Sequence, residues 1–223
     1  LLNANTSISF DDFNAIKHDN AYSPRYRGYA YLSSVAQLEP DDPEESQALS
    51  LIRNWDLHTD TSNRSAALGV CVLLEEWQAE RSGSALPDAR ETLHTCMDSV
   101  RDVAGQLDPE WGTVQQHGRG QRTWPAAGGP DTLRAMYAEQ LEDEDDFLTV
   151  VAGDGLYYLI EWNAEGEQTI RGTHQYGSQM TDESSPHYLD QAEPFSQEIM
   201  RAPGFYPENR SATSRQYTVS SAD

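Results

Sequence analysis

The sequence has very few lysines: Lys17 is the only one among its 15 basic residues, and all the others are arginine. Acidic residues number 37, which gives a formal net charge of −22. Phosphate backbones and anionic lipid surfaces are bound through clusters of lysine and arginine. This charge balance therefore argues against a nucleic-acid-binding protein and against docking on an anionic membrane.

Long apolar runs are also missing. No stretch approaches the ~20 apolar residues that a membrane-spanning helix needs, and the most apolar segment, residues 66–74, is typical of a core helix. The first residues do not follow the basic-then-apolar pattern of a signal peptide. We therefore expect no membrane span and no visible leader.

The excess of acid over lysine has two interpretations. It resembles proteins from salt-adapted organisms, because at 1 M salt the Debye length falls to about 3 Å and like charges stop repelling one another. Alternatively, the protein is acidic but from an ordinary habitat, with arginine favoured by GC-rich coding.

Only two cysteines occur, Cys71 and Cys96, and neither belongs to a CxxC motif. The six histidines show no HxxxH or HExxH spacing, so no metal site is predicted. Both cysteines fall within predicted helices. They are either two small core side chains or a disulfide between those helices.

The familiar catalytic motifs are absent. There is neither a GxSxG elbow nor a Walker loop, and 37 acidic residues make any pair of carboxylates uninformative. The basic segment HGRGQR at 117–122 is expected to pair with acidic neighbours. The tyrosines between Tyr22 and Tyr31 are expected to pack rather than to stack on a sugar or base. The motifs and charged residues by themselves therefore predict no particular reaction.

The first half of the chain is predicted to be helical. Residues 8–18 form a short helix capped by Ser9, and residues 19–36 are irregular. Asp42, Pro43 and Glu45 mark the start of a longer helix, with Glu45 in the capping-box position.

Three apolar stripes at helical spacing predict one core. They are Ala48, Leu51, Ile52 and Trp55; Ala66, Ala67, Val70, Leu73, Leu74 and Trp77; and Leu93, Cys96, Met97, Val100 and Val103. The second helix is expected to start near Ser62 or Asn63. The third runs from Pro87 to Gly105.

A long loop is expected over residues 106–130, followed by a short helix at 132–140. The charge run at 142–146 is expected to be a solvated turn.

Strands are predicted only after residue 146. Residues 147–152 and 156–162 should pair as a hairpin across the turn at 153–155. A turn at 163–166 is expected to lead to a third strand at 168–174, and a last strand is expected at 216–219. The near-continuous apolar residues suggest a sheet covered on both faces. The prediction is an α+β chain with a mainly helical lobe at 1–141 and a β-rich segment and tail at 142–223.

Several stretches resemble, in the same order, the C-terminal part of the β-chain of penicillin-acylase-type enzymes, most closely the acyl-homoserine-lactone and aculeacin A acylases. They are SFDDFNAIKHD at 9–19, LIRNWD at 51–56, TSNRSAAL at 61–68, EWG at 110–112, GGPDTLRAMY at 128–137, VAGDGLYYLIEWNAEGE at 151–167 and HQYGSQMTDESSPHYLDQAEPF at 174–195. The positions that carry the likeness are Trp55, Asp56, Trp111, Gly112, Gly128, Gly129, Asp131, Gly153, Asp154, His174, Gly177, Pro186, His187, Tyr188, Asp190 and Gln191.

The resemblance implies an N-terminal-nucleophile hydrolase with an αββα sandwich, in which a helical lobe is followed by antiparallel strands of the central sheet. In such enzymes self-cleavage frees a serine at the start of the β-chain. Its hydroxyl attacks an amide carbonyl while its own amino group acts as the base. The resemblance implies a small acyl-amide substrate, no cofactor, and a periplasmic or secreted location.

The chain departs from the family pattern because it starts with Leu1 rather than serine. We therefore expect it to carry none of the catalytic groups, and to need the α-chain and the N-terminal part of the β-chain as partners. His174 and His187 are expected to be structural, and Asp190 and Gln191 to satisfy turn N–H groups. The alternative is a non-catalytic binding or scaffold module derived from an acylase.

Overall fold

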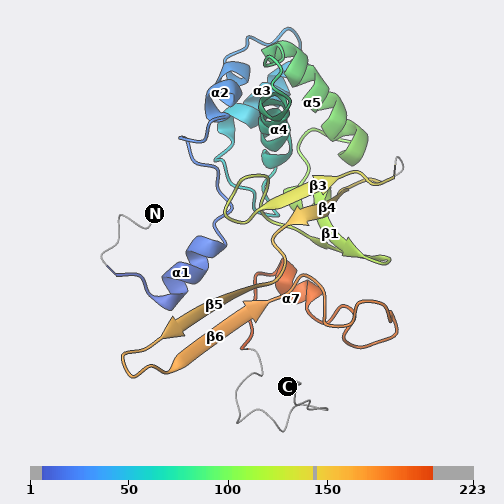
Figure 1. The fold of residues 1–223 in the computed structure, drawn as a ribbon. Helices are drawn as coiled ribbons and strands as arrows, with labels where there is room; N and C mark the ends of the chain where they lie inside the picture. The colour runs from blue at the N-terminus through green and yellow to red at the C-terminus, as the bar shows by residue number, and fades with distance from the viewer. Residues whose placement is uncertain (1–6, 143–144, 203–223) are drawn as a thin grey trace.

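A computed structural model describes residues 7–142 and 145–202, which form an α+β fold (Figure 1). The helices are α1 (Phe10–Lys17), α2 (Tyr29–Ala36), α3 (Pro43–Asn54), α4 (Ala66–Ser82), α5 (Ala89–Ala104), α6 (Trp111–Val114) and α7 (Ala192–Ser196). The strands are β1 (Gln115–Arg119), β2 (Arg122–Pro125), β3 (Met136–Glu139), β4 (Leu148–Gly153), β5 (Tyr157–Trp162) and β6 (Gln168–Thr173).

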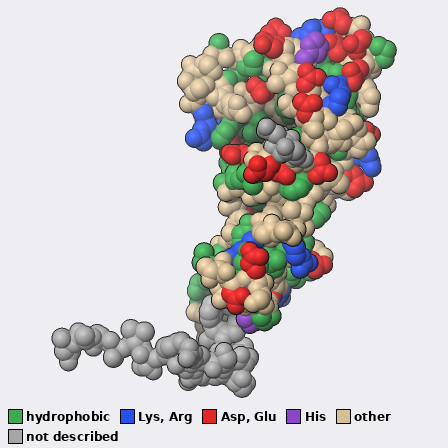
Figure 2. Space-filling model, turned by 90° about the vertical axis from the view of Figure 1, so that its right-hand side faces the viewer, with side chains coloured by type: hydrophobic (Ala, Val, Ile, Leu, Met, Phe, Trp, Pro, Cys, Tyr) green, Lys and Arg blue, Asp and Glu red, His purple; other side chains and the backbone are tan. Residues whose placement is uncertain are grey.

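The molecule has a helical lobe of α2–α5, a sheet beneath it, and a lower part built from α1, α7 and the β5–β6 ribbon (Figure 1). Acidic side chains are spread over the lobe, and the molecule narrows below it (Figure 2). None of the helices described at 7–142 and 145–202 has both the length and the apolar character to cross a bilayer.

The predicted helix ends follow from local capping. Ser9 and Asp12 bond reciprocally at the start of α1, and the Asp42 carboxylate accepts the N–H groups of Glu44 and Glu45 ahead of α3. Gly105 ends α5 in the left-handed region, where glycine carries no steric penalty. These three predictions are confirmed.

Two predictions for residues 19–70 were wrong. Residues 19–36 are irregular only at first, because α2 fills the second half and buries Tyr31, Leu32 and Val35. Helix α4 begins at Ala66, later than expected, and the Asn63 side chain accepts the N–H groups of Ser65 and Ala66 at its start.

The three apolar stripes meet in one core, as predicted, although Leu51, Leu74 and Trp77 are only half-buried. Gly69, in the middle of α4, admits the indole ring of Trp55. A Cβ at this position would lie 2.1 Å from the ring. Gly69 therefore allows α3 and α4 to approach closely, although glycine inside a helix is less favourable than alanine.

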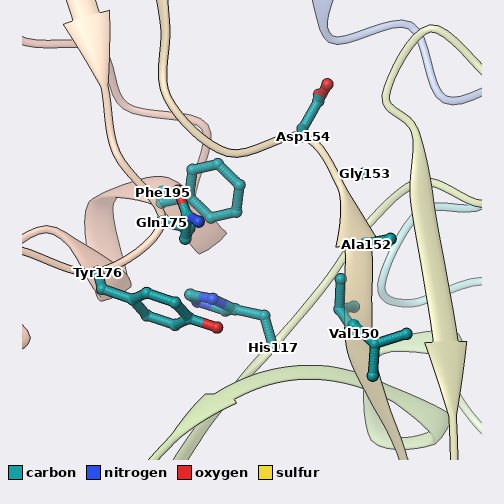
Figure 3. A pocket seen from close by; sticks show the side chains of 9 residues that line it. His117, Val150, Ala152, Gly153, Asp154, Gln175, Tyr176 and Phe195 are labelled. Atoms are coloured by element: carbon teal, nitrogen blue, oxygen red, sulfur yellow. The ribbon is translucent and has the colours of Figure 1, made fainter.

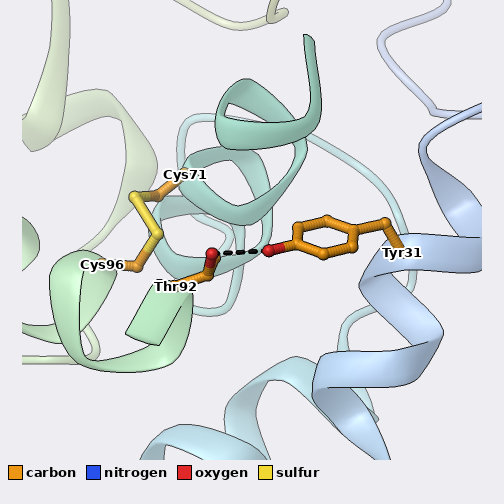
Figure 4. Close-up of a disulfide and its surroundings, with 4 residues drawn as sticks. All are labelled: Tyr31, Cys71, Thr92 and Cys96. Carbon is orange, nitrogen blue, oxygen red and sulfur yellow. Dashed lines mark hydrogen bonds between the residues drawn. A yellow bond between two sulfur atoms is a disulfide. The ribbon is translucent and has the colours of Figure 1, made fainter. Parts of the chain in front are cut away.

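Cys71 and Cys96 form a disulfide that joins α4 to α5 (Figure 4). Their Cα atoms lie 5.7 Å apart, within the range that disulfides require. Beside them the hydroxyl groups of Tyr31 and Thr92 lie 2.5 Å apart and link α2 to α5. Of the two interpretations of the cysteines, the disulfide holds.

The predicted loop at 106–130 is wrong, because it contains α6 and the antiparallel pair β1–β2. The predicted helix at 132–140 is wrong as well, because β3 occupies this segment and pairs with β4. Strand order in this sheet is β2-β1-β4-β3, and β1 and β4 are parallel. The sheet is therefore mixed rather than antiparallel, and it draws on residues from both sides of position 142.

The predicted hairpin between β4 and β5 does not form. Strand β5 pairs instead with β6 in a separate two-stranded sheet, across the turn at 163–166 that the sequence predicted correctly. The chain leaves the first sheet at Gly153, where φ is 121° and a Cβ would lie 2.2 Å from the Ala135 carbonyl oxygen. The last predicted strand, 216–219, lies outside the described residues.

The strands are not covered on both faces by the described residues, contrary to the prediction. Val151 of β4 and three alternate side chains of β5 are exposed apolar groups. The three on β5 are Tyr158, Ile160 and Trp162.

We predict that replacing both Cys71 and Cys96 with serine lowers the free energy of unfolding by about 3 kcal/mol, because the disulfide closes a loop between residues 25 positions apart. Urea unfolding with and without reductant measures the difference. Reductant should destabilise the native protein and leave the double variant unchanged. Equal stability of the native protein and the double variant would contradict a stabilising role for the disulfide.

A second prediction concerns Glu45, which is 2% exposed. It does not close the predicted capping box. Its carboxylate accepts the Asp41 N–H at 2.7 Å and contacts Arg90 and His94, each at 2.6 Å. The Asp41 N–H first, then His94 and Arg90, lower the pKa of Glu45 to about 2, from its ordinary value near 4.5.

Because the pKa is lower in the folded state, the stabilisation from Glu45 is present above pH 4.5 and disappears as the pH falls towards 2. The stability gap between native protein and Glu45→Gln should therefore shrink over this range, measured as urea midpoints. The neighbouring Glu44→Gln serves as the control, since Glu44 pairs with Arg101 at the surface, where ion pairs contribute little. A gap that does not change with pH would refute this account.

Candidate functional site

A partly buried, charge-balanced cluster lies between the sheet and the lower part of the molecule. Its centre is Arg134, whose side chain is 1% exposed. The guanidinium contacts Asp154 at 3.1 Å and Glu198 at 3.4 Å, and Lys17 contacts the same Asp154 oxygen at 2.5 Å. We call these four residues the Arg134 cluster. Two cations facing two carboxylates meet the condition under which charges can be buried.

The cluster joins four distant segments. Lys17 ends α1, Arg134 precedes β3, Asp154 follows β4 and Glu198 follows α7. Arg134 also donates to the Phe195 carbonyl oxygen at 3.1 Å. Burial raises the pKa of Glu198, and the positive charge of Arg134 opposes that rise.

His18 and Tyr157 extend this arrangement to the second sheet. The His18 Nε2 lies 2.6 Å from the Tyr157 hydroxyl, and Lys17 lies over the Tyr157 ring at 4.6 Å. Burial lowers the pKa of His18 and raises the pKa of Tyr157 to about 12. Both groups are therefore neutral near pH 7 and hold α1 against β5 by a neutral hydrogen bond.

Glycines allow the backbone to close around Arg134. At Gly128, where φ is 99°, a Cβ would lie 2.0 Å from the Arg134 carbonyl oxygen. The Gly129 N–H donates to the same oxygen at 3.3 Å, and the Trp111 indole donates to the Gly128 carbonyl at 2.9 Å. The GGPD and VAGDG motifs thus form the backbone shell of the cluster.

Other motif positions order loops within the lobe. Asp131 accepts from Tyr26, Arg27 and Tyr137, and burial followed by the Asp131 charge raises the pKa of Tyr26. The Asp56 carboxylate accepts the His58 N–H at 3.0 Å.

Trp55 is buried and donates to the His58 carbonyl at 2.7 Å. In α6, a Cβ at Gly112 would lie 2.7 Å from the Thr61 side chain.

The segment 174–191 folds back on itself at Gly177, where a Cβ would lie 2.1 Å from the His187 carbonyl oxygen. His187 is exposed, and its imidazole contacts the Asp190 carboxylate at 3.1 Å. The Gln191 backbone N–H donates to the Tyr176 carbonyl oxygen. The Asp190 carboxylate therefore contacts the His187 imidazole. The sequence had predicted that it would accept N–H groups of the turn.

Two further motif positions fit this turn. Pro186 lies within it, and the His174 imidazole accepts the Tyr176 N–H at 3.1 Å.

Among residues 7–142 and 145–202, no acidic side chain pairs with the basic segment 117–122, contrary to the prediction. Arg119 donates to the carbonyl oxygens of Met180 and Tyr188, and its guanidinium lies 4.1 Å from the Tyr188 ring centre. Arg122 lies over Trp124. These arginines bind carbonyl groups and aromatic faces, which guanidinium does well.

The structure therefore brings Gly128, Gly129, Gly153 and Asp154 together around Arg134. Trp55 and Asp56 lie at the end of α3 in the lobe, Asp131 lies in the loop ahead of β3, and the 174–191 turn lies beside α7. Sequence reasoning missed Arg134, Lys17 and Glu198. The available signals were the isolated lysine and an arginine inside the GGPDTLRAMY motif.

Chemically, the Arg134 cluster is a clamp. Its two cations and two carboxylates neutralise one another, and its four members include no serine, threonine or cysteine that could act as a nucleophile. Across the described ranges 7–142 and 145–202, no three histidine, cysteine, aspartate or glutamate side chains group to hold a metal ion.

Comparison with known families gives one further finding. A family model described as Penicillin amidase matches residues 1–212. The match includes every motif position discussed above.

We predict that Arg134→Met destabilises the chain by about 3 kcal/mol, because two partly buried carboxylates lose the fully buried cation that they share. The matched control is Arg171→Met, whose guanidinium is 48% exposed and pairs with Asp11 at 3.8 Å. That change should cost less than about 0.5 kcal/mol. Urea unfolding compares the two, and similar losses would contradict the clamp.

Proposed function

The chain belongs to the penicillin amidase family, and from this we propose that it is the C-terminal portion of an acylase that removes an acyl chain from an amine. Family membership implies an amidohydrolase of the acylase type. The match over residues 1–212 is the observation that carries the proposal. The proposed substrates are linear amides such as acyl-homoserine lactones, aculeacin or penicillin.

In this proposal the catalytic serine lies on another segment of the acylase. Its hydroxyl oxygen attacks the amide carbonyl, the C–N bond breaks with proton transfer to the leaving amine, and water then hydrolyses the acyl ester. The present chain contributes the helical lobe and the clamp. The ion pairs of the Arg134 cluster, which join four segments of the chain, support this structural role.

Unpartnered apolar surface supports the presence of further polypeptide. Helix α1 buries none of its eight residues, and Trp162 on β5 is 59% exposed. A two-stranded ribbon is marginally stable by itself. We propose that the α-chain and the N-terminal part of the β-chain cover this lower part and extend the β5–β6 sheet into an αββα sandwich.

A periplasmic or secreted location is also part of the proposal. The disulfide between Cys71 and Cys96 supports it, because disulfides persist in oxidising compartments.

The test supplies the α-chain and N-terminal β-chain portion of a penicillin-amidase-family acylase in trans. Amine release from benzylpenicillin and acyl-homoserine lactones should appear only in the mixture, and should vanish when the partner's N-terminal serine becomes alanine. Light scattering should show a complex. A chain that remains monomeric and inactive with every partner would instead favour the scaffold module.

The surface can be tested separately. Trp162→Glu should abolish complex formation and amine release, because a carboxylate would be buried against the partner. Leu86→Glu is the control, since Leu86 is 54% exposed and lies between α4 and α5 in the lobe. Equal effects of the two changes would contradict the proposed docking face.

A further inference from the structure

A cavity opens where the two parallel strands of the first sheet separate. Strands β1 and β4 pair only through Gln115 with Leu148 and Gln116 with Thr149. Beyond these pairs lies a cavity of about 220 Å³, between residues 150–154 on one side and a group of four side chains on the other (Figure 3). The four are His117, Gln175, Tyr176 and Phe195. The carboxyl ends of separating parallel strands are a common position for ligand sites.

The cavity contains two buried acceptors without partners. His117 is 2% exposed, and its Nε2 donates to the Ala192 carbonyl oxygen at 3.2 Å, which leaves a lone pair on Nδ1. Among the described residues nothing bonds this Nδ1 or the buried Oε1 of Gln175. Buried polar atoms are nearly always satisfied, so an unsatisfied pair facing one cavity indicates a missing donor.

The charges around the cavity restrict the ligand. Burial lowers the pKa of His117 to about 4, with the nearby Arg134 charge contributing, so the imidazole is a neutral acceptor at pH 7. The guanidinium groups of Arg119 and Arg134 lie over Tyr176 and Phe195, at 5.0 and 4.4 Å. The one lining carboxylate, Asp154, already pairs with Lys17 and Arg134. The arginines therefore disfavour a cation, while the two free acceptors disfavour a carboxylate.

Aromatic surfaces favour a flat ligand. The Tyr176 ring stacks on His117 at 14° with centroids 5.8 Å apart, and Phe195 lies 5.2 Å from the same imidazole. A planar neutral group with two N–H donors meets both requirements.

We propose that this cavity binds a neutral primary carboxamide, with its NH₂ group donating to His117 Nδ1 and Gln175 Oε1. The site binds without cleaving, because none of its nine lining residues is a serine, threonine or cysteine. The proposal goes beyond the proposed function and stands whether or not the chain is part of an acylase.

Benzamide and benzoate form a matched pair of probes, since they share size and ring but differ in the donor. The full chain labelled with ¹⁵N-histidine is titrated with each at pH 7 and observed by NMR. Benzamide should shift the His117 Nδ1 resonance to saturation, and benzoate should not. Equal shifts from both compounds, or no shift from benzamide, would overturn the proposal.

Two variants test the acceptors separately. Gln175→Leu and His117→Phe should each weaken benzamide binding about tenfold, the loss expected for one hydrogen bond. His187→Phe is the control, because His187 lies outside the cavity, and it should bind benzamide like the native protein. If His117→Phe does not fold, Gln175→Leu and the benzoate comparison still decide. Unchanged binding to Gln175→Leu would refute the assigned contact.

Discussion

The buried guanidinium of Arg134 is the constraint on which the arrangement of the molecule depends. A charge taken out of water must be met by opposite charge and by hydrogen-bond acceptors, and Arg134 finds them on two other segments, at Asp154 and at residues 195–198. The glycines at 128 and 153 follow from that requirement, because only they let the backbone approach closely enough. The motif glycines and the ion pairs are thus one structural unit.

The parts of the fold that depend on local chemistry could be predicted from the sequence. Asp42 ahead of Pro43, Gly105 after α5 and the turn at 163–166 each act within a few residues of their own position. The three apolar stripes likewise have a period that identifies the buried helix faces. Such features need no knowledge of where the rest of the chain lies.

Strand partners and buried charges could not be predicted in this way. The segment 132–140 has a good helix start, yet β3 exists because β4 offers it a ladder from another part of the chain. The same holds for β5, whose partner is β6 rather than its predecessor β4. Arg134 was missed because its burial depends on Lys17, Asp154 and Glu198, none of which is close to it in sequence.

The position of Lys17 and Glu198 in one cluster has a mechanical consequence. Lys17 ends the first helix and Glu198 follows the last, so both ends of the described chain converge on the same guanidinium and its counter-ions. Strand β6 links the same two ends, because Arg171 pairs with Asp11 and Gly172 exchanges backbone hydrogen bonds with Arg201. Tension applied between the two ends is therefore shared between the ion pairs of the cluster and the β5–β6 ribbon, and the helical core and the disulfide lie outside this path.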